Sequence, residues 1–258
     1  MAETQNPRDG STISYDISGQ GPAIVLLHGS ALSRAIWRGL GYVKGLEGFT
    51  VVRIDLRGHG RSSKPHRPQD YAMDLLVGDV VAVLDAEQLA SAVIMGYSFG
   101  ARVAFSLAAA APGRVEKLVS LGGTFKAQGG QIAEVFFEGY LQALRTGGMQ
   151  AFVDGQQLDP QTRFAFMNND ARALHAYFER TEIEAGIEES VVASLELPAL
   201  LFAGTRDRRR YLDSRAAAEL MPAARFVPLE GRTHGSTLAA VDEVLAQLLP
   251  FLQGEATY

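Results

Sequence analysis

The sequence predicts an α/β fold with a doubly wound, mostly parallel sheet and one helical insertion. The first supporting observation is a series of short apolar runs rich in β-branched residues, which is typical of strands buried on both faces. The second is that helical patterns alternate with these runs, as in right-handed strand–helix–strand units. The third is that residues 125–195 carry helical patterns and no convincing strand.

Six core strands are predicted in chain order from the apolar runs. They are Ala23–Leu27, Thr50–Ile54, Ala92–Met95, Lys117–Leu121, Ala199–Ala203 and Ala224–Pro228. An antiparallel hairpin is expected before them, with Ser11–Ser18 as one arm. The helical patterns between the strands lie at Asp74–Leu89, Gly100–Ala111, Asp213–Leu220 and Val241–Leu252. Their apolar residues recur at the spacing of one helix face or, in the second, fill the whole helix.

The alternation of strand and helix stops after Leu121. Three helices are predicted in the following stretch, at Gln131–Leu144, Pro160–Phe178 and Glu182–Leu195, separated by Gly, Asp and Pro residues. An insertion at the C-terminal edge of a parallel sheet lies over the crevice where such sheets bind ligands. We therefore expect a core made of residues 1–124 and 196–258 and a helical cap made of residues 125–195.

Composition narrows the classes of function. The 258 residues are 47% apolar, which suffices for one large core with an insertion. The net charge of −5 shows no excess of positive charge for binding nucleic acid or an anionic membrane. The absence of cysteine excludes disulfides, thiolate metal sites and cysteine nucleophiles. Met1–Gly10 has no signal-peptide pattern, and no apolar run has the length of a membrane span. We expect a soluble cytoplasmic protein.

A G-x-S-x-G motif marks a candidate nucleophile. It spans Gly96–Gly100 (GYSFG) and lies directly between the strand Ala92–Met95 and the helix that follows. A serine at such a turn is held in a strained conformation, so the residues two positions before and after it must be small. The helix start offers free N–H groups and a positive dipole end to a developing oxyanion. Ser98 is the predicted nucleophile.

The serine hydroxyl needs a base and an acid that orients the base. Of the five histidines, His234 is the best placed, because it follows the last predicted strand. Loops at the C-terminal ends of strands are where catalytic residues gather in this architecture. Asp207, directly after the preceding strand, is the predicted acid. Asp159 and Asp213 are alternatives in poorer positions.

Two backbone N–H groups are expected to form an oxyanion hole. One belongs to Phe99, the residue after the nucleophile. The second is assigned to Ser30, in the loop that ends the strand Ala23–Leu27. His28 in the same loop is predicted to have a structural role, holding the loop by hydrogen bonds.

Four motifs make the chain, from about residue 11 to residue 252, resemble the α/β-hydrolase superfamily. They are His28-Gly29, the loop Asp55–Ser62 (DLRGHGRS), the G-x-S-x-G turn, and Gly204–Asp207 with His234. The order Ser98, Asp207, His234 also matches that class. The resemblance implies a sheet of eight strands, a helical cap over 125–195 and an acyl-enzyme mechanism.

The same resemblance assigns the loop Asp55–Ser62 a structural role. Asp55 and His59 are therefore not expected to bind a metal, although such a pair is a common metal ligand set. No metal and no cofactor are predicted, because the sequence contains neither a G-x-x-x-x-G-K pattern nor a complete dinucleotide fingerprint.

Two features depart from the superfamily pattern. Asp207 is followed by Arg208-Arg209-Arg210, where related proteins often carry apolar residues or proline. We interpret this run as a solvated or ion-paired loop, with binding of an anionic substrate group as the alternative. The segment Thr233-His234-Gly235-Ser236 lacks the bulky residue that often follows the family's histidine, which predicts a wider pocket.

The leading prediction of function is a serine hydrolase that cleaves a small, largely apolar carboxylic ester or lactone. The candidate substrate-binding residues are Trp37, Phe136, Tyr140 and Phe166, each weighed against a purely structural place in a core. A C–C bond hydrolase and a cofactor-free perhydrolase use the same triad and stay as alternatives, as does a non-enzymatic ligand receptor. The partner is expected to be a small ester-like molecule, not nucleic acid or membrane, and the oligomeric state is left open. The resemblance also implies that Ser98 argues against haloalkane dehalogenases and epoxide hydrolases, whose nucleophile is an aspartate.

Overall fold

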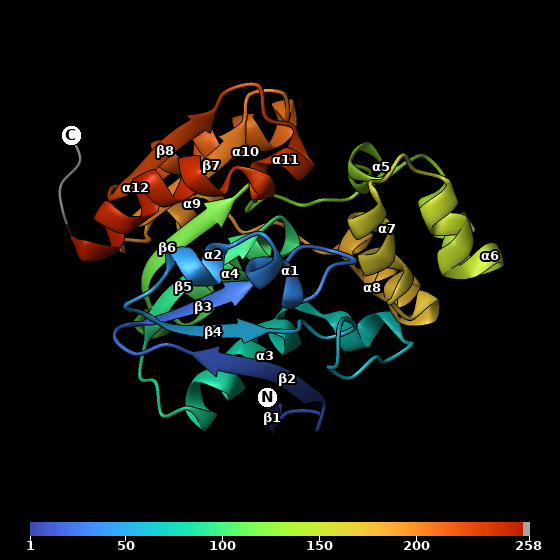
Figure 1. Ribbon diagram of the computed structural model, residues 1–258, viewed down its shortest axis with the longest axis horizontal. Helices are drawn as coiled ribbons and strands as arrows, with labels where there is room; N and C mark the ends of the chain where they lie inside the picture. Colours follow the sequence, from blue (N-terminus) through green and yellow to red (C-terminus); the bar gives the residue numbers. More distant parts are fainter. Residues whose placement is uncertain (255–258) are drawn as a thin grey trace.

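The computed structural model describes residues 1–254, which form an eight-stranded sheet flanked by helices (Figure 1). The strands are β1 Ala2–Gln5, β2 Thr12–Ser18, β3 Ala23–Leu27, β4 Thr50–Ile54, β5 Ala92–Tyr97, β6 Val115–Leu121, β7 Ala199–Gly204 and β8 Ala224–Leu229. Their spatial order is β1-β2-β4-β3-β5-β6-β7-β8. The β1–β2 and β2–β4 pairs are antiparallel and the other five are parallel. The predicted mostly parallel sheet of eight strands is confirmed.

The central strands are apolar along their whole length because helices cover both faces of the sheet. Every residue of β5 and of β7 is buried. The expected opening hairpin is present, with β2 as the predicted arm and β1 as its partner, in a register that places Ala2 opposite Tyr15. This hairpin extends the sheet at the edge farthest from β8.

Two groups of helices flank the sheet. α3 (Met73–Ala86) and α4 (Phe99–Ala110) pack against each other, and α2 (Tyr42–Gly45) contacts α12 (Val241–Gln253). Figure 1 shows α2 in front of the sheet and α3 and α4 behind it. The remaining elements outside the β6–β7 connection are α1 Ala35–Gly39, α10 Arg208–Leu220, α11 His234–Ala239 and the 3₁₀ turns η1 Pro68–Tyr71 and η2 Pro112–Arg114.

The chain between β6 and β7 is helical but more divided than predicted. Its helices are α5 Ile132–Val135, α6 Tyr140–Asp154, α7 Pro160–Met167, α8 Ala171–Ile183 and α9 Glu189–Ala193. The first predicted helix, Gln131–Leu144, is divided, because α5 ends at Val135 and α6 begins after Gly139, which has φ of +83°. Asp170 starts α8 by accepting the N–H groups of Arg172 and Ala173, so the predicted helix Pro160–Phe178 is two helices. The predicted Glu182–Leu195 reduces to the short α9.

Helix α10 begins five residues earlier than predicted. The arginine run expected as a loop forms its first turn, and Asp207 precedes it as the N-cap residue. Arginine is a strong helix former, so nothing in the run itself stops the helix.

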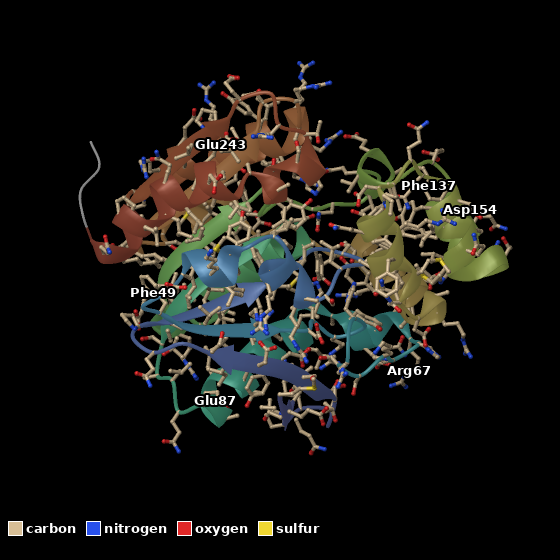
Figure 2. All side chains as sticks on the ribbon, in the orientation of Figure 1. Phe49, Arg67, Glu87, Phe137, Asp154 and Glu243 are labelled. Atoms are coloured by element: carbon tan, nitrogen blue, oxygen red, sulfur yellow. The ribbon has the colours of Figure 1, made fainter. Side chains whose placement is uncertain are left out.

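Side chains fill the space between the sheet and its helices (Figure 2). Two residues labelled there mark the region of helices α5–α8 beside the sheet: Phe137 in the connection between α5 and α6, and Asp154 at the end of α6. Within residues 1–254, no helix is both long enough and apolar enough to cross a membrane.

Candidate active site

Ser98 lies in the sharp turn between β5 and α4. Its backbone has φ of +53° and ψ of −114°, a region that L residues rarely adopt. The turn is held by neighbouring structure, because the Ser98 N–H donates to the Leu121 carbonyl at 2.9 Å and the Ser98 carbonyl accepts from Arg102 at 3.1 Å. The strained conformation raises the hydroxyl above the edge of the sheet, where a substrate can reach it.

Glycine is required at two positions of this turn. A Cβ on Gly96 would lie 2.3 Å from the backbone of Gly100, and a Cβ on Gly100 would lie 2.1 Å from the Leu27 carbonyl oxygen. Both distances are far inside van der Waals contact with backbone that cannot yield. The two glycines of the motif therefore allow the backbones of β5, α4 and β3 to approach closely.

His234 connects Ser98 to Asp207 by hydrogen bonds. Its Nε2 lies 2.9 Å from Ser98 Oγ, and its Nδ1 lies 2.6 Å from Asp207 Oδ2. The ionised carboxylate can only accept, so Nδ1 carries the proton and Nε2 is free to accept the serine hydroxyl proton. Tyr97 donates its hydroxyl to the His234 carbonyl at 3.1 Å and helps to fix the start of α11.

Asp207 is the only one of the three proposed acids that contacts the histidine. The short Asp207–His234 bond is mostly shielded, with side-chain exposures of 12% and 15%. Asp159 instead caps α7 by accepting the N–H groups of Gln161 and Thr162. Asp213 instead pairs with Arg210.

The two predicted oxyanion donors come from separate segments of the chain. The Phe99 N–H is at the start of α4, where helical amides have no partner within the helix. Ser30 lies in the loop after β3, and the Ser30 hydroxyl is 2.5 Å from the hydroxyl of Tyr177 in α8. Among residues 1–254, neither the Phe99 nor the Ser30 N–H donates to another group of the chain. Both are available to a developing oxyanion.

Two buried histidines hold the loop between β3 and α1, residues 28–34, which contains the predicted donor Ser30 and is called the oxyanion loop below. His28 donates from Nδ1 to the Gly29 carbonyl and accepts the Leu56 N–H at Nε2. His59 donates from Nδ1 to the Arg57 carbonyl and accepts the Ala31 N–H at Nε2. These partners require the neutral Nδ1–H form of each ring. Ala31 has φ of +62°, so His59 fixes the loop in a conformation it would not adopt alone.

Burial lowers the pKa of both histidines, that of His59 from an ordinary 6.5 to about 3. Between these values the unfolded chain binds a proton at His59 that the folded chain does not, so folded stability falls as the pH drops below 6.5. From pH 7 to pH 5, the free energy of unfolding should fall by about 2 kcal/mol more in the wild type than in His59→Gln. Urea unfolding at the two pH values measures this difference. Equal losses in both proteins would contradict the neutral, buried state of His59.

No metal site is found among residues 1–254. No group of three His, Cys, Asp or Glu side chains there could hold an ion. Asp55 accepts from the Arg34 guanidinium at 2.6 Å and from the Arg34 and Arg61 N–H groups. The Asp55 carboxylate is therefore used in hydrogen bonds that fix the loop Asp55–Ser62.

A large, mainly apolar cavity opens beside the Ser98–His234 pair. Its volume is about 580 Å³. The core side of its wall includes Ser30, Leu32 and Ile36, and the wall from the β6–β7 connection includes Phe136, Leu158 and Phe166. Both Phe136 and Phe166 thus lie where substrate-binding residues were predicted.

Two predicted lining residues lie elsewhere. Trp37 is fully buried in the core, with its ring packed edge-on against Tyr42 at 5.1 Å between centroids. Tyr140 packs edge-on against Phe178, and its hydroxyl donates to Glu182 at 2.6 Å. Neither side chain lines the large cavity, so the structure does not place them where substrate-binding residues were predicted. Trp37 packs in the core, and Tyr140 packs and hydrogen-bonds among the helices between β6 and β7.

Tyr177 and Arg102 are site-supporting residues that sequence reasoning did not single out. The fully buried ring of Tyr177 contacts those of Phe99 and His59, so it joins α8 to the start of α4 and to the loop Asp55–Ser62. Arg102, one turn after Ser98, donates to the carbonyls of Phe125 and Ala185. The one feature of the sequence that could have pointed to Arg102 is a charged residue in a predicted helix whose other residues are mostly small and apolar.

A sequence model of the alpha/beta hydrolase fold family matches residues 22–156, just over half of the chain. Epoxide hydrolase B of Mycobacterium tuberculosis is 41% identical over 110 residues, which are 43% of this chain and 31% of that protein. The chain thus matches about a third of the length of this curated relative.

Solved structures resemble the whole chain. A hydrolase from Pseudomonas aeruginosa PA01 matches with a TM-score of 0.82 and 25% identity, over 96% of this chain and 97% of that one. Est816, an N-acyl homoserine lactone degrading enzyme, matches with a TM-score of 0.77 and 25% identity, over 97% of this chain and 100% of that one. The likeness covers both the sheet and the helices between β6 and β7.

Proposed function

The chain belongs to the alpha/beta hydrolase fold family, and on that premise we propose that it is a serine hydrolase acting on a small, largely apolar carboxylic ester or lactone. The observation that carries the proposal is the hydrogen-bonded series Ser98–His234–Asp207 at the wall of the apolar cavity. This arrangement activates a hydroxyl for attack on an acyl carbon.

The reaction follows from the positions of the donors and acceptors. Ser98 Oγ attacks the carbonyl carbon while His234 Nε2 takes its proton, and the N–H groups of Phe99 and Ser30 hold the oxygen that becomes negative. His234 then gives the proton to the leaving alcohol oxygen, which leaves an acyl-serine. Water attacks this ester with His234 again as the base, and the acid is released. Asp207 stabilises the imidazolium in both halves.

The serine supports acyl transfer over the activity named for the curated relative. Epoxide hydrolase B is similar to less than half of this chain, and an activity carried by a whole protein does not follow from a partial match. Est816, which is similar along its full length, degrades lactones, and a lactone is a cyclic carboxylic ester. A hydroxyl nucleophile with two N–H donors suits that carbonyl chemistry.

We also propose that residues 125–195 act as a cap over this site. Phe136, Leu158 and Phe166 from that segment complete the apolar cavity, and Tyr177 bonds the oxyanion loop. The cap would therefore select the substrate by size and polarity while the core performs the reaction. The reaction needs only these side chains and water, so we propose no cofactor.

Labelling with a fluorophosphonate tests the proposal directly. An activated Ser98 should form a stable adduct, and peptide mass spectrometry should locate it on the segment containing Ser98. Esters of 4-nitrophenol with acyl chains of increasing length should be hydrolysed by the same protein. Folded protein that neither labels nor hydrolyses any ester would refute the proposal. Labelling without ester turnover would refute the substrate class and favour a C–C hydrolase or a ligand receptor.

A further inference from the structure

Arg210 is a buried cation beside the nucleophile. Only 3% of the residue is exposed, although it lies in an arginine run whose other two members are exposed. It lines a small second cavity of about 20 Å³, and Ser98 and Ser30 line the same cavity. Space of this size holds a water molecule or a compact group of a ligand in its place. A buried arginine at the nucleophile is costly unless a negative partner compensates it.

The negative partners of Arg210 are shared or incomplete. Its Nη1 is 3.2 Å from Asp213 Oδ2 and 3.4 Å from Gln131 Oε1. The other oxygen of Asp213 is 3.9 Å from Lys126 Nζ, so one carboxylate serves two cations. Asp207 is already used by His234. Within residues 1–254, the Nε and Nη2 groups of Arg210 make no hydrogen bond, which leaves three N–H donors free.

Arg209 shows the contrast. It forms a two-pronged pair with Glu134, with distances of 2.6 and 3.0 Å, and both side chains are about half exposed. This neighbouring arginine is therefore neutralised at the surface. The unbalanced positive charge is specific to Arg210 and to the cavity it lines.

The two cavities beside Ser98 differ in whether His234 lines them. Ser98 and Ser30 line both cavities, but His234 lines only the large one. The small cavity has an apolar wall that includes Ile132 and Phe178, and Arg210 is the one charged residue among the described residues that line it. The leaving alcohol must lie next to His234, because that residue gives it a proton. The alcohol part of the substrate therefore fits the large cavity, and the compact end group of a short acyl part reaches the small one.

We propose that Arg210 binds a carboxylate on the acyl group, so that the favoured substrate is an ester between a short dicarboxylic acid and an apolar alcohol. The inference rests on the proposed hydrolase function and specifies its substrate. One carboxyl carbon of the acid is attacked by Ser98, and the other stays ionised against the Arg210 guanidinium. Hydrolysis by one water gives the dicarboxylate and the alcohol. Arginine suits this role because its planar fork matches a carboxylate.

Two esters of equal shape test the proposal. Hexyl hydrogen succinate carries the second carboxylate, and hexyl 4-methylpentanoate replaces it with an isopropyl group of similar shape. We expect the wild type to have the higher kcat/KM for the succinate, measured by acid release at constant pH. In Arg210→Met the ratio of the two kcat/KM values should fall about 10- to 100-fold, as expected for loss of a charged hydrogen-bonding partner. Arg210→Lys should retain part of the ratio, and Arg209→Met should keep it.

Wild-type protein alone can overturn the proposal, so the result does not depend on the variants folding. Equal kcat/KM for the two esters, or a preference for the neutral one, would refute it while leaving the hydrolase function intact. Circular dichroism and thermal unfolding of the variants check the fold, and Arg210→Met/Asp213→Asn removes the unpaired carboxylate if the single variant is unstable.

A binding measurement separates failure of the subsite from failure of the hydrolase function. Succinate should bind to Ser98→Ala in calorimetry, and the added Arg210→Met should weaken this binding about 10- to 100-fold. If neither ester is hydrolysed and the fluorophosphonate does not label, the hydrolase function fails. Succinate binding then still decides whether the anion subsite exists, and absence of binding refutes it.

Discussion

Ser98→Ala is expected to lower ester hydrolysis by about 10⁴- to 10⁶-fold while leaving the protein folded. The substitution removes only the hydroxyl group, and the oxygen of that group is the atom that His234 Nε2 contacts at 2.9 Å. Alanine also removes no backbone constraint, because the turn is held by Gly96 and Gly100 and by bonds to Leu121 and Arg102. The activity that remains should come from the oxyanion donors and from binding in the cavity.

Ser106→Ala is the matched control for this variant. Ser106 lies on the same helix, two turns farther on, and its hydroxyl donates to the Arg102 carbonyl at 3.0 Å. Its loss should reduce stability by about 1 kcal/mol and leave kcat/KM unchanged. Steady-state kinetics on one ester, together with thermal unfolding, compares the three proteins. Equal activity of Ser98→Ala and the wild type would show that another group carries out the attack.

Asp207→Asn should lower kcat by about 10⁴-fold. The carboxylate accepts the Nδ1 proton of His234 over 2.6 Å and so leaves Nε2 free for the serine hydroxyl. An asparagine amide can donate to Nδ1 instead, which moves the ring proton to Nε2 and turns the base into a donor. The imidazolium formed during the reaction also loses its counter-charge. KM should change far less than kcat, because Asp207 does not face the large cavity.

Asp159→Asn separates the catalytic acid from a nearby alternative. Asp159 caps α7, and asparagine is an equally good capping residue, so this variant should be stable and active. Nitrogen NMR of the histidine rings supplies a readout beyond the rate, because the ring proton of His234 should be on Nδ1 in the wild type and on Nε2 in Asp207→Asn. A variant with normal kcat, or an unchanged tautomer, would contradict the role given to Asp207.

The local patterns were sufficient to predict the sheet and to predict that Ser98, Asp207 and His234 lie together. Runs such as Ala23–Leu27 and Ala199–Ala203 are apolar throughout because both faces of each strand are covered, and that condition is visible in the residues themselves. The placement of Ser98, Asp207 and His234 after three separate strands was enough to expect them together, since the C-terminal ends of parallel strands meet at one edge.

The helices between β6 and β7 were harder to delimit. The pattern Pro160–Phe178 is amphipathic across its middle, so periodicity alone joined two helices into one. The break occurs because the Asp170 side chain accepts two backbone N–H groups at the start of α8. The sequence does not show this bond, because an aspartate can also lie inside a helix. Trp37 and Tyr140 were misplaced for a related reason, because an aromatic residue gives the same signal whether it faces a core or a cavity.

The sequence by itself determined the mostly parallel sheet, the strained serine turn and which three residues form the Ser98–His234–Asp207 hydrogen-bonded series. Only the tertiary structure decided which side chains face the substrate and which arginine is buried. A local pattern indicates which residues of a segment are buried, because apolar residues avoid water. It does not indicate which other segment covers them. Whether Arg210 or Arg209 points to the nucleophile depends on the rotation of α10 against β7 and on contacts with residues such as Gln131, which are far away in the sequence.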